Sequence, residues 1–179
     1  MGISRRLPSW PQVAQVYAVI VLMVYGWTIM WFLWKVPSWL AFLSAGEMLA
    51  VLAYALAANL IESLAVLCVP VCVGIILPQK WFNDAFVARA AALMLAGIGA
   101  SIFVALQFKD RDVLPSLLVG PWRPALMLLG IAVGVYLAGR FAILRRALEL
   151  LADRATIFLY VSLPLSLLAM LTLAARWLR

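Results

Sequence analysis

The sequence of 179 residues contains no histidine. Histidine is a common ligand of haem iron and transition metals, and it is the base of the usual serine and cysteine catalytic pairs. Its absence excludes imidazole-based metal centres and those catalytic pairs from this chain. We therefore expect no cofactor, no metal site and no catalytic residue, and an enzymatic role is the less favoured interpretation.

Cysteine and acidic residues are also scarce. The two cysteines, Cys68 and Cys72, lie four residues apart in an apolar run, so they share one face of a helix. This placement favours small buried apolar side chains over a disulfide framework. The run Lys109–Asp112 alternates basic and acidic residues, which is typical of a solvated loop and not of a metal site. No phosphate-binding glycine loop and no HExxH or CxxC motif occurs.

What the chain does have is apolar residues: 68% of it is hydrophobic, 12% is charged, and the mean hydropathy is +1.10. A soluble domain is typically about 45–50% apolar and about 25% charged. A globule of this size has too little interior to hide so many apolar side chains. The composition therefore predicts an all-α integral membrane bundle, a single transmembrane domain over residues 1–179, with membrane lipids as its surroundings.

The apolar residues fall into long segments, each near the 20 or so residues that cross a bilayer. They predict five transmembrane helices, at about 12–34, 47–77, 85–108, 124–144 and 155–177. The first is too long for a cleaved signal peptide, so we interpret it as a retained signal anchor. The second is longer than a bilayer requires, and we interpret it as one tilted helix, kinked at Pro70. Splitting it would give six spans.

The segment ends carry their own signals. Lys35 and Pro37 interrupt the apolar pattern and are expected to end the first helix. Between the fourth and fifth helices, residues 144–154 alternate apolar and charged positions at helical spacing, which predicts an amphipathic turn at the membrane surface. Pro164 is expected to kink the fifth helix.

The net charge of +7 is spread over short basic clusters between the apolar segments. This distribution suits anionic lipid headgroups and the positive-inside rule, and we expect no nucleic-acid binding. A cytoplasmic N-terminus and an outside C-terminus place a modest excess of Lys and Arg in the cytoplasm, whereas six spans remove that excess. We therefore expect a multi-pass protein of a prokaryotic inner membrane.

One polar stripe interrupts the second segment. Glu62 lies near the middle of this segment, and Asn59 is one turn earlier. Tyr54 and Glu47 lie further back along the segment, each within about 80° of Glu62 around the helix. A charged group at that depth is costly unless it is paired or neutralised. One interpretation is a site for a proton, a cation or a lipid headgroup. The other is a protonated Glu62 hydrogen-bonded to another helix, with Asn59 joining helices.

Basic residues form a second candidate group near the predicted cytoplasmic face. Arg89 and Arg140 lie just inside two helix ends, and Arg145 and Arg146 follow. Arginines at such positions usually extend to the lipid phosphates at the interface. The alternative is a shared pocket for a lipid-linked phosphate.

Small residues mark candidate helix-packing faces in the third and fourth segments. They are Ala92, Ala96 and Ala100 in the third, and Gly130 and Gly134 in the fourth. Such spacing lets helix backbones approach closely within a membrane. It predicts either a tightly packed pair of helices or a face for another subunit.

Three functions remain open. The first is a non-enzymatic membrane subunit or anchor that packs against other membrane proteins, because the loops are short and no catalytic set is present. The second is a small channel or carrier for protons, cations or a small solute that uses Glu62 and Asn59. The third is a protein that handles a lipid-linked phosphate through the arginine group, and it ranks last because no base or metal site accompanies it.

Overall fold

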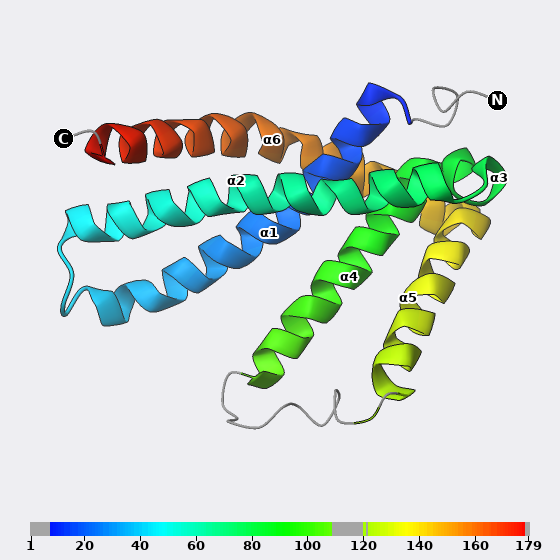
Figure 1. Cartoon of the computed structure of the whole chain (residues 1–179), viewed down its shortest axis with the longest axis horizontal. Helices are drawn as coiled ribbons and strands as arrows, with labels where there is room; N and C mark the ends of the chain where they lie inside the picture. Colours follow the sequence, from blue (N-terminus) through cyan, green and yellow to red (C-terminus); the bar gives the residue numbers. More distant parts are fainter. Residues whose placement is uncertain (1–7, 109–119, 121, 178–179) are drawn as a thin grey trace.

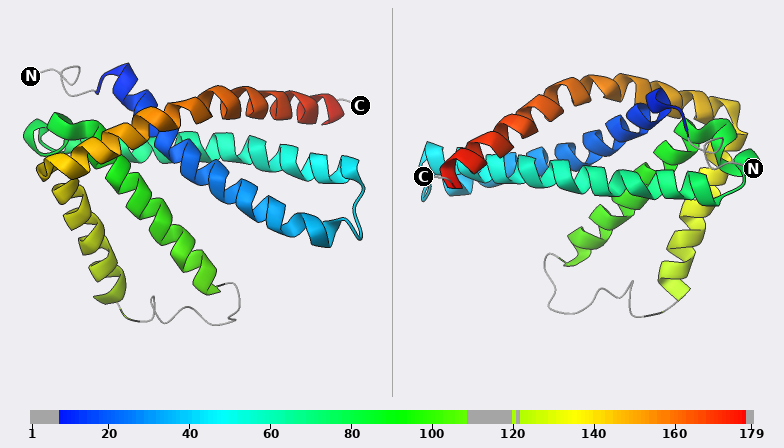
Figure 2. Two further views of the ribbon diagram at one scale, coloured as in Figure 1. Left: turned by 180° about the vertical axis from the view of Figure 1, so that it is seen from behind. Right: turned by 45° about the horizontal axis from the view of Figure 1, so that its top comes forward.

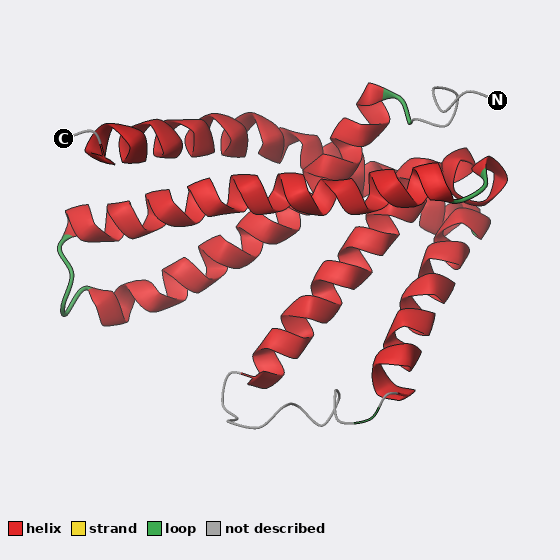
Figure 3. Ribbon diagram, viewed as in Figure 1, coloured by secondary structure: helices red, strands yellow, loops and turns green. Residues whose placement is uncertain are grey.

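The computed structural model describes residues 8–108, 120 and 122–177. Regular structure in these ranges is entirely helical (Figure 3). In chain order the elements are α1 (Trp10–Trp39), α2 (Ala45–Ile76), α3 (Gln79–Phe82), the 3-10 turn η2 (Asn83–Ala85), α4 (Phe86–Phe108), α5 (Trp122–Arg140) and α6 (Ala142–Trp177). Five helices are long and apolar enough to cross a membrane, which confirms the predicted number.

The long helices form two groups that meet at one end of the molecule. Helices α1, α2 and α6 run side by side, and α4 and α5 leave them as a second arm (Figures 1 and 2). The end of α2, the start of α4, the end of α5 and the start of α6 all gather where the two groups join (Figure 1). The end of α6 lies at the opposite extreme, beside the turn between α1 and α2.

Helix α1 is the centre of the packing. Val16 and the run Ala18–Val21 are fully buried, so this part of α1 is enclosed on every side. A helix that is apolar all round is expected in such a central position. The first half of α4, including Phe86 and Ala90, packs into the same core. Among the described residues of α5, by contrast, only Ala138 is buried.

The segment predicted at 47–77 is one helix, Ala45–Ile76, which confirms the prediction of a single long helix in this part of the chain. Ser44 caps it: the Ser44 hydroxyl accepts from the Glu47 N–H at 3.4 Å, and the Glu47 carboxylate accepts from the Ser44 N–H at 2.8 Å. This reciprocal capping box satisfies donors that the first turn leaves free. Pro70 lies inside the helix and is buried, as membrane-type helices tolerate.

Two predicted helix ends are wrong. Helix α1 continues through Lys35 and Pro37 to Trp39, because a proline removes only one backbone bond and the helix resumes: the Leu40 N–H donates to Val36 at 3.0 Å. Helix α5 ends at Arg140, four residues early, just after the weak helix former Gly139.

The predicted break between the fourth and fifth helices is also wrong. Residues 144–154 are the first turns of α6 and not a separate surface turn. The physical reason is that residues 142–163 contain no glycine or proline, so nothing interrupts the helix once it begins. The interruption lies instead at Phe141, between α5 and α6.

The prediction of buried cysteines is wrong as well. Cys68 and Cys72 are both unpaired and lie on the exposed face of α2. The Cys68 thiol lies 3.7 Å from the Leu64 carbonyl oxygen, one turn earlier. The run was apolar on every face, so periodicity did not say which face would pack.

Candidate functional site

A cleft of about 210 Å³ lies between α1, α2 and α4. Each of these helices contributes one polar side chain to it: Thr28, Glu62 and Ser101, respectively. The other lining residues are apolar: Met23, Val24, Trp27, Ile98, Ile102 and Ala105. The cleft therefore combines one carboxylate and two hydroxyls with an apolar wall.

The three polar groups lie close to the midpoints of their helices. At about 1.5 Å per residue, Glu62 is about 2 Å from the midpoint of α2. On the same basis Thr28 is about 5 Å from the midpoint of α1, and Ser101 is about 6 Å from the midpoint of α4. All three thus lie far from the helix ends, where water and headgroups would solvate them in a membrane.

Both hydroxyl hydrogens at the cleft are already used. The Thr28 hydroxyl donates to Asn59 Oδ1 at 3.1 Å, and the Ser101 hydroxyl donates to the Gly97 carbonyl at 3.0 Å. Asn59 is only 5% exposed, and its Nδ2 has no partner within the described ranges. With the residues that the structure describes, Glu62 makes no hydrogen bond and no ion pair. The cleft consequently presents acceptor oxygens and no free hydroxyl hydrogen.

The predicted polar stripe is brought together only in part. Thr28 links Glu62 to Asn59. It lines the cleft together with Glu62, and its hydroxyl donates to Asn59 Oδ1. Glu47 is held at the start of α2 by Ser44 and lies more than three turns away along the helix. Tyr54 is 57% exposed and does not line the cleft.

Sequence reasoning missed Thr28 and Ser101, although each is an isolated hydroxyl residue in an apolar run. It also missed two bonds that hold α1 in the bundle. The Tyr25 hydroxyl lies 2.8 Å from Ser166 Oγ on α6, and the Tyr17 hydroxyl lies 3.2 Å from Ser63 Oγ on α2. Ser63 already donates to the Leu60 carbonyl at 3.1 Å, so Tyr17 is the donor. Buried polar pairs of this kind join helices in membranes.

The predicted arginine group gathers where the two helix groups join, but its members have separate contacts. Arg89 donates to the Trp81 carbonyl, and its guanidinium lies against Gly139, where any side chain would overlap it. Arg145 pairs with Glu149 on α6 at 2.8 Å. Arg146 lines a shallow surface depression, and Arg140 is exposed on the last turn of α5.

That surface depression has mixed charge. Its lining residues are Gln15, Arg146, Glu149, Leu150 and Asp153. The carboxylates of Glu149 and Asp153 beside Arg146 lower the local positive potential, so the depression is a poor site for a doubly charged phosphate.

The small residues of α4 and α5 are partly covered: Gly130 is exposed, and Gly134 and the named residues of α4 are half-buried. A Cβ at Gly97, Gly99, Gly130 or Gly134 would meet no atom within 4 Å, so these glycines do not mediate a close approach inside the chain. Of the alanines, Ala92 and Ala96 are half-buried, and Ala100 lines a second, larger groove between the two helices.

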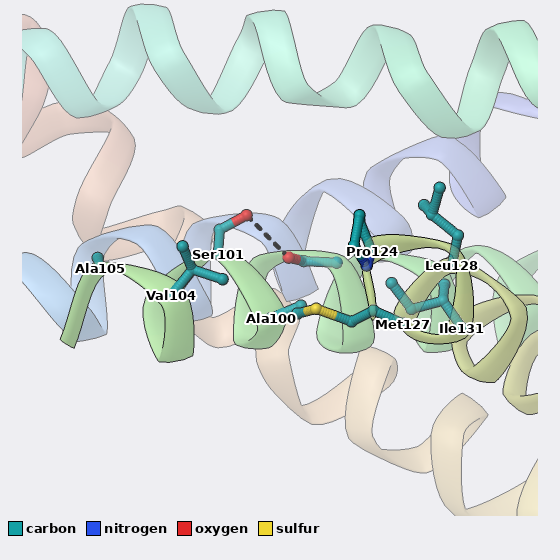
Figure 4. Close-up of a pocket in the computed structure, with 9 residues that line it drawn as sticks. Ala100, Ser101, Val104, Ala105, Pro124, Met127, Leu128 and Ile131 are labelled. Carbon is teal, nitrogen blue, oxygen red and sulfur yellow. Dashed lines mark hydrogen bonds between the residues drawn. The ribbon is translucent and has the colours of Figure 1, made fainter. Parts of the chain in front are cut away.

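This second groove has a volume of about 630 Å³ (Figure 4). Its other lining residues are Gly97, Ser101, Val104, Ala105, Pro124, Met127, Leu128 and Ile131. The only hydroxyl among them is that of Ser101, which is satisfied by the Gly97 carbonyl (Figure 4). The groove is therefore an apolar surface with no unmet polar group among its lining side chains.

Comparison with known proteins adds no relative: no family model, no curated protein and no solved structure matches this chain. Within the described residues there is also no group of three or more histidine, cysteine, aspartate or glutamate side chains able to hold a metal ion.

Proposed function

We propose that the chain is a non-enzymatic membrane subunit, embedded in a prokaryotic inner membrane with its N-terminus in the cytoplasm. In this proposal α5 and the adjoining face of α4 pack against a transmembrane helix of a partner protein. The observation that carries it is the exposure of α5: only 6% of its apolar window is buried, against 44% for α1.

The character of the exposed face favours a helix over lipid as its cover. Met127 lines the α4–α5 groove, and Gly130 and Gly134 follow at helical spacings of three and seven residues, so all three share one face of α5. Glycine on a lipid-facing surface contributes little packing, whereas between helices it permits close backbone contact. The partner is therefore expected to present an apolar helix with small side chains.

The test is photo-crosslinking in native membranes. A photoreactive amino acid replaces Leu126, which is 57% exposed and lies one turn before Gly130. A matched control probe replaces Ile61, which is 64% exposed on α2. We expect a discrete adduct with one membrane protein from position 126 and none from position 61.

The adduct must also depend on the glycine face. Gly130→Leu with Gly134→Leu is expected to abolish it, although leucine favours a helix more than glycine does. Ala132→Leu is the control, because Ala132 lies two residues from each glycine and so on the opposite side of α5. An adduct with lipid alone, or with a second copy of this chain alone, would overturn the proposal.

A further inference from the structure

We propose that the cleft between α1, α2 and α4 binds a small protonated amine, a ligand with N–H donors and one positive charge on an apolar body. The cleft shares Ser101 and Ala105 with the α4–α5 groove, but its other polar groups, Thr28 and Glu62, lie on α1 and α2. The proposal does not depend on the partner contact. It rests on the hydrogen-bonding character, the charge and the size of the cleft.

The two hydroxyl groups of the cleft can only accept hydrogen bonds from a ligand. Thr28 and Ser101 have each committed their single hydroxyl hydrogen, to Asn59 and to the Gly97 carbonyl. What remains for a ligand is the lone pairs of both hydroxyls and of the Glu62 carboxylate. A ligand that pairs with these oxygens must therefore supply donors. Asn59 acts as a positioning residue, because it holds the Thr28 hydrogen away from the cleft.

Charge points the same way. Among the residues that the structure describes, Glu62 lines the cleft and no lysine or arginine does. In a membrane-spanning α2 this carboxylate lies near the bilayer centre, where an unpaired charge is costly. A cationic ligand would neutralise Glu62 and form charge-assisted hydrogen bonds with it.

The rest of the lining selects the kind of cation. Calcium and magnesium ions take about six to eight oxygen ligands, more than the side chains of Glu62, Thr28 and Ser101 provide. The remaining wall is apolar and includes Trp27, an indole of the kind that attracts organic cations. The volume of about 210 Å³ is below the roughly 300 Å³ at which drug-sized sites begin. A short-chain ammonium matches all three features.

The experiment is calorimetric titration of the full chain in lipid nanodiscs with n-butylammonium. We expect saturable binding that Glu62→Gln weakens about tenfold or more, because a charge-assisted bond becomes a neutral one. Glu47→Gln is the matched control on the same helix, and it is expected to leave binding within about twofold, since glutamine also completes a capping box. Equal binding by the wild type and Glu62→Gln overturns the proposal.

Three further ligands separate the contributions of the apolar body, the positive charge and the N–H donors to binding. Butanol has a comparable body without charge, tetramethylammonium has charge without N–H donors, and sodium ion has neither body nor donors. We expect n-butylammonium to bind most tightly of the four. If tetramethylammonium or sodium binds as tightly, the cleft does not recognise amine donors and the proposal is wrong.

A chemical readout covers the case in which Glu62→Gln does not fold. An apolar carbodiimide modifies carboxyl groups that lie within a membrane, and peptide mass spectrometry locates the adduct. In the wild type we expect labelling at Glu62 that n-butylammonium reduces at least several-fold and butanol does not. Labelling that is unchanged by the amine contradicts occupancy of the cleft.

Discussion

The hydrogen bond between Tyr25 and Ser166 is expected to be a measurable tie between α1 and α6. Its O···O distance is 2.8 Å, the most favourable for two hydroxyls. Tyr25 is 4% exposed and Ser166 is fully buried, so water cannot replace either partner after mutation. Polar side-chain pairs between membrane helices contribute about 0.6 kcal/mol on average and at most about 1.7 kcal/mol. We expect about 1 kcal/mol for this pair.

The perturbation is a double-mutant cycle with Tyr25→Phe and Ser166→Ala. Each substitution removes one hydroxyl and leaves most of the side-chain volume, so the cycle isolates the bond from packing. The free energy of unfolding is measured by detergent titration in bicelles, followed by circular dichroism. Ser166 in the Tyr25→Phe variant can turn its hydroxyl to a backbone carbonyl of the preceding turn, which limits the single-mutant loss.

The pair Tyr17 and Ser63 provides the internal comparison. Its O···O distance is 3.2 Å, longer than the range of good hydroxyl bonds. Ser63 also keeps its bond to the Leu60 carbonyl when Tyr17 is replaced. The coupling energy of this pair should therefore be the smaller of the two, about 0.5 kcal/mol or less. A coupling of zero at Tyr25–Ser166, or a larger one at Tyr17–Ser63, would refute the reasoning.

Three more predictions use the same preparation or intact cells. Gly139→Ala should change the free energy of unfolding by no more than about 1 kcal/mol, because the Arg89 guanidinium that the new methyl meets ends a flexible side chain and can move, and alanine favours the helix by up to about 1 kcal/mol. A larger loss that Arg89→Ala relieves would show that the guanidinium cannot move aside. Ser44→Ala should cost about 1 kcal/mol by removing the cap of α2, while Glu47→Gln should cost less. A reporter active only in the cytoplasm should work when fused to the N-terminus and fail when fused to the C-terminus, and the reverse result would invert the predicted orientation.

Much of the helical framework follows from the sequence because it depends on length and composition. An apolar segment of about 20 residues or more has few alternatives to a helix when water cannot solvate its backbone. The single long helix α2 is predictable because no glycine–proline cluster divides it. The ends of α1 and α5 were not predictable, since a proline such as Pro37 can stop a helix or remain inside it depending on what packs around it.

The candidate site is likewise predictable from the sequence only in part. Glu62 and Asn59 stand out in the sequence because polar residues are rare in apolar segments. The cleft brings Glu62 together with Thr28 and Ser101, which lie 73 residues apart in the chain. Only the three-dimensional arrangement of the helices could show this. The helices are apolar nearly all round, so their periodicity carries little information about which faces meet.

The absence of histidine by itself excluded imidazole-based metal centres and catalytic pairs from this chain, and its apolar segments determined five helices long enough to cross a membrane. Only the tertiary structure decided that the exposed cysteines, the capped Glu47 and the cleft-lining Glu62 of one helix have three different surroundings. The physical reason is that segment formation depends on local composition and backbone hydrogen bonding, whereas the choice of helix faces depends on packing between residues far apart in the chain.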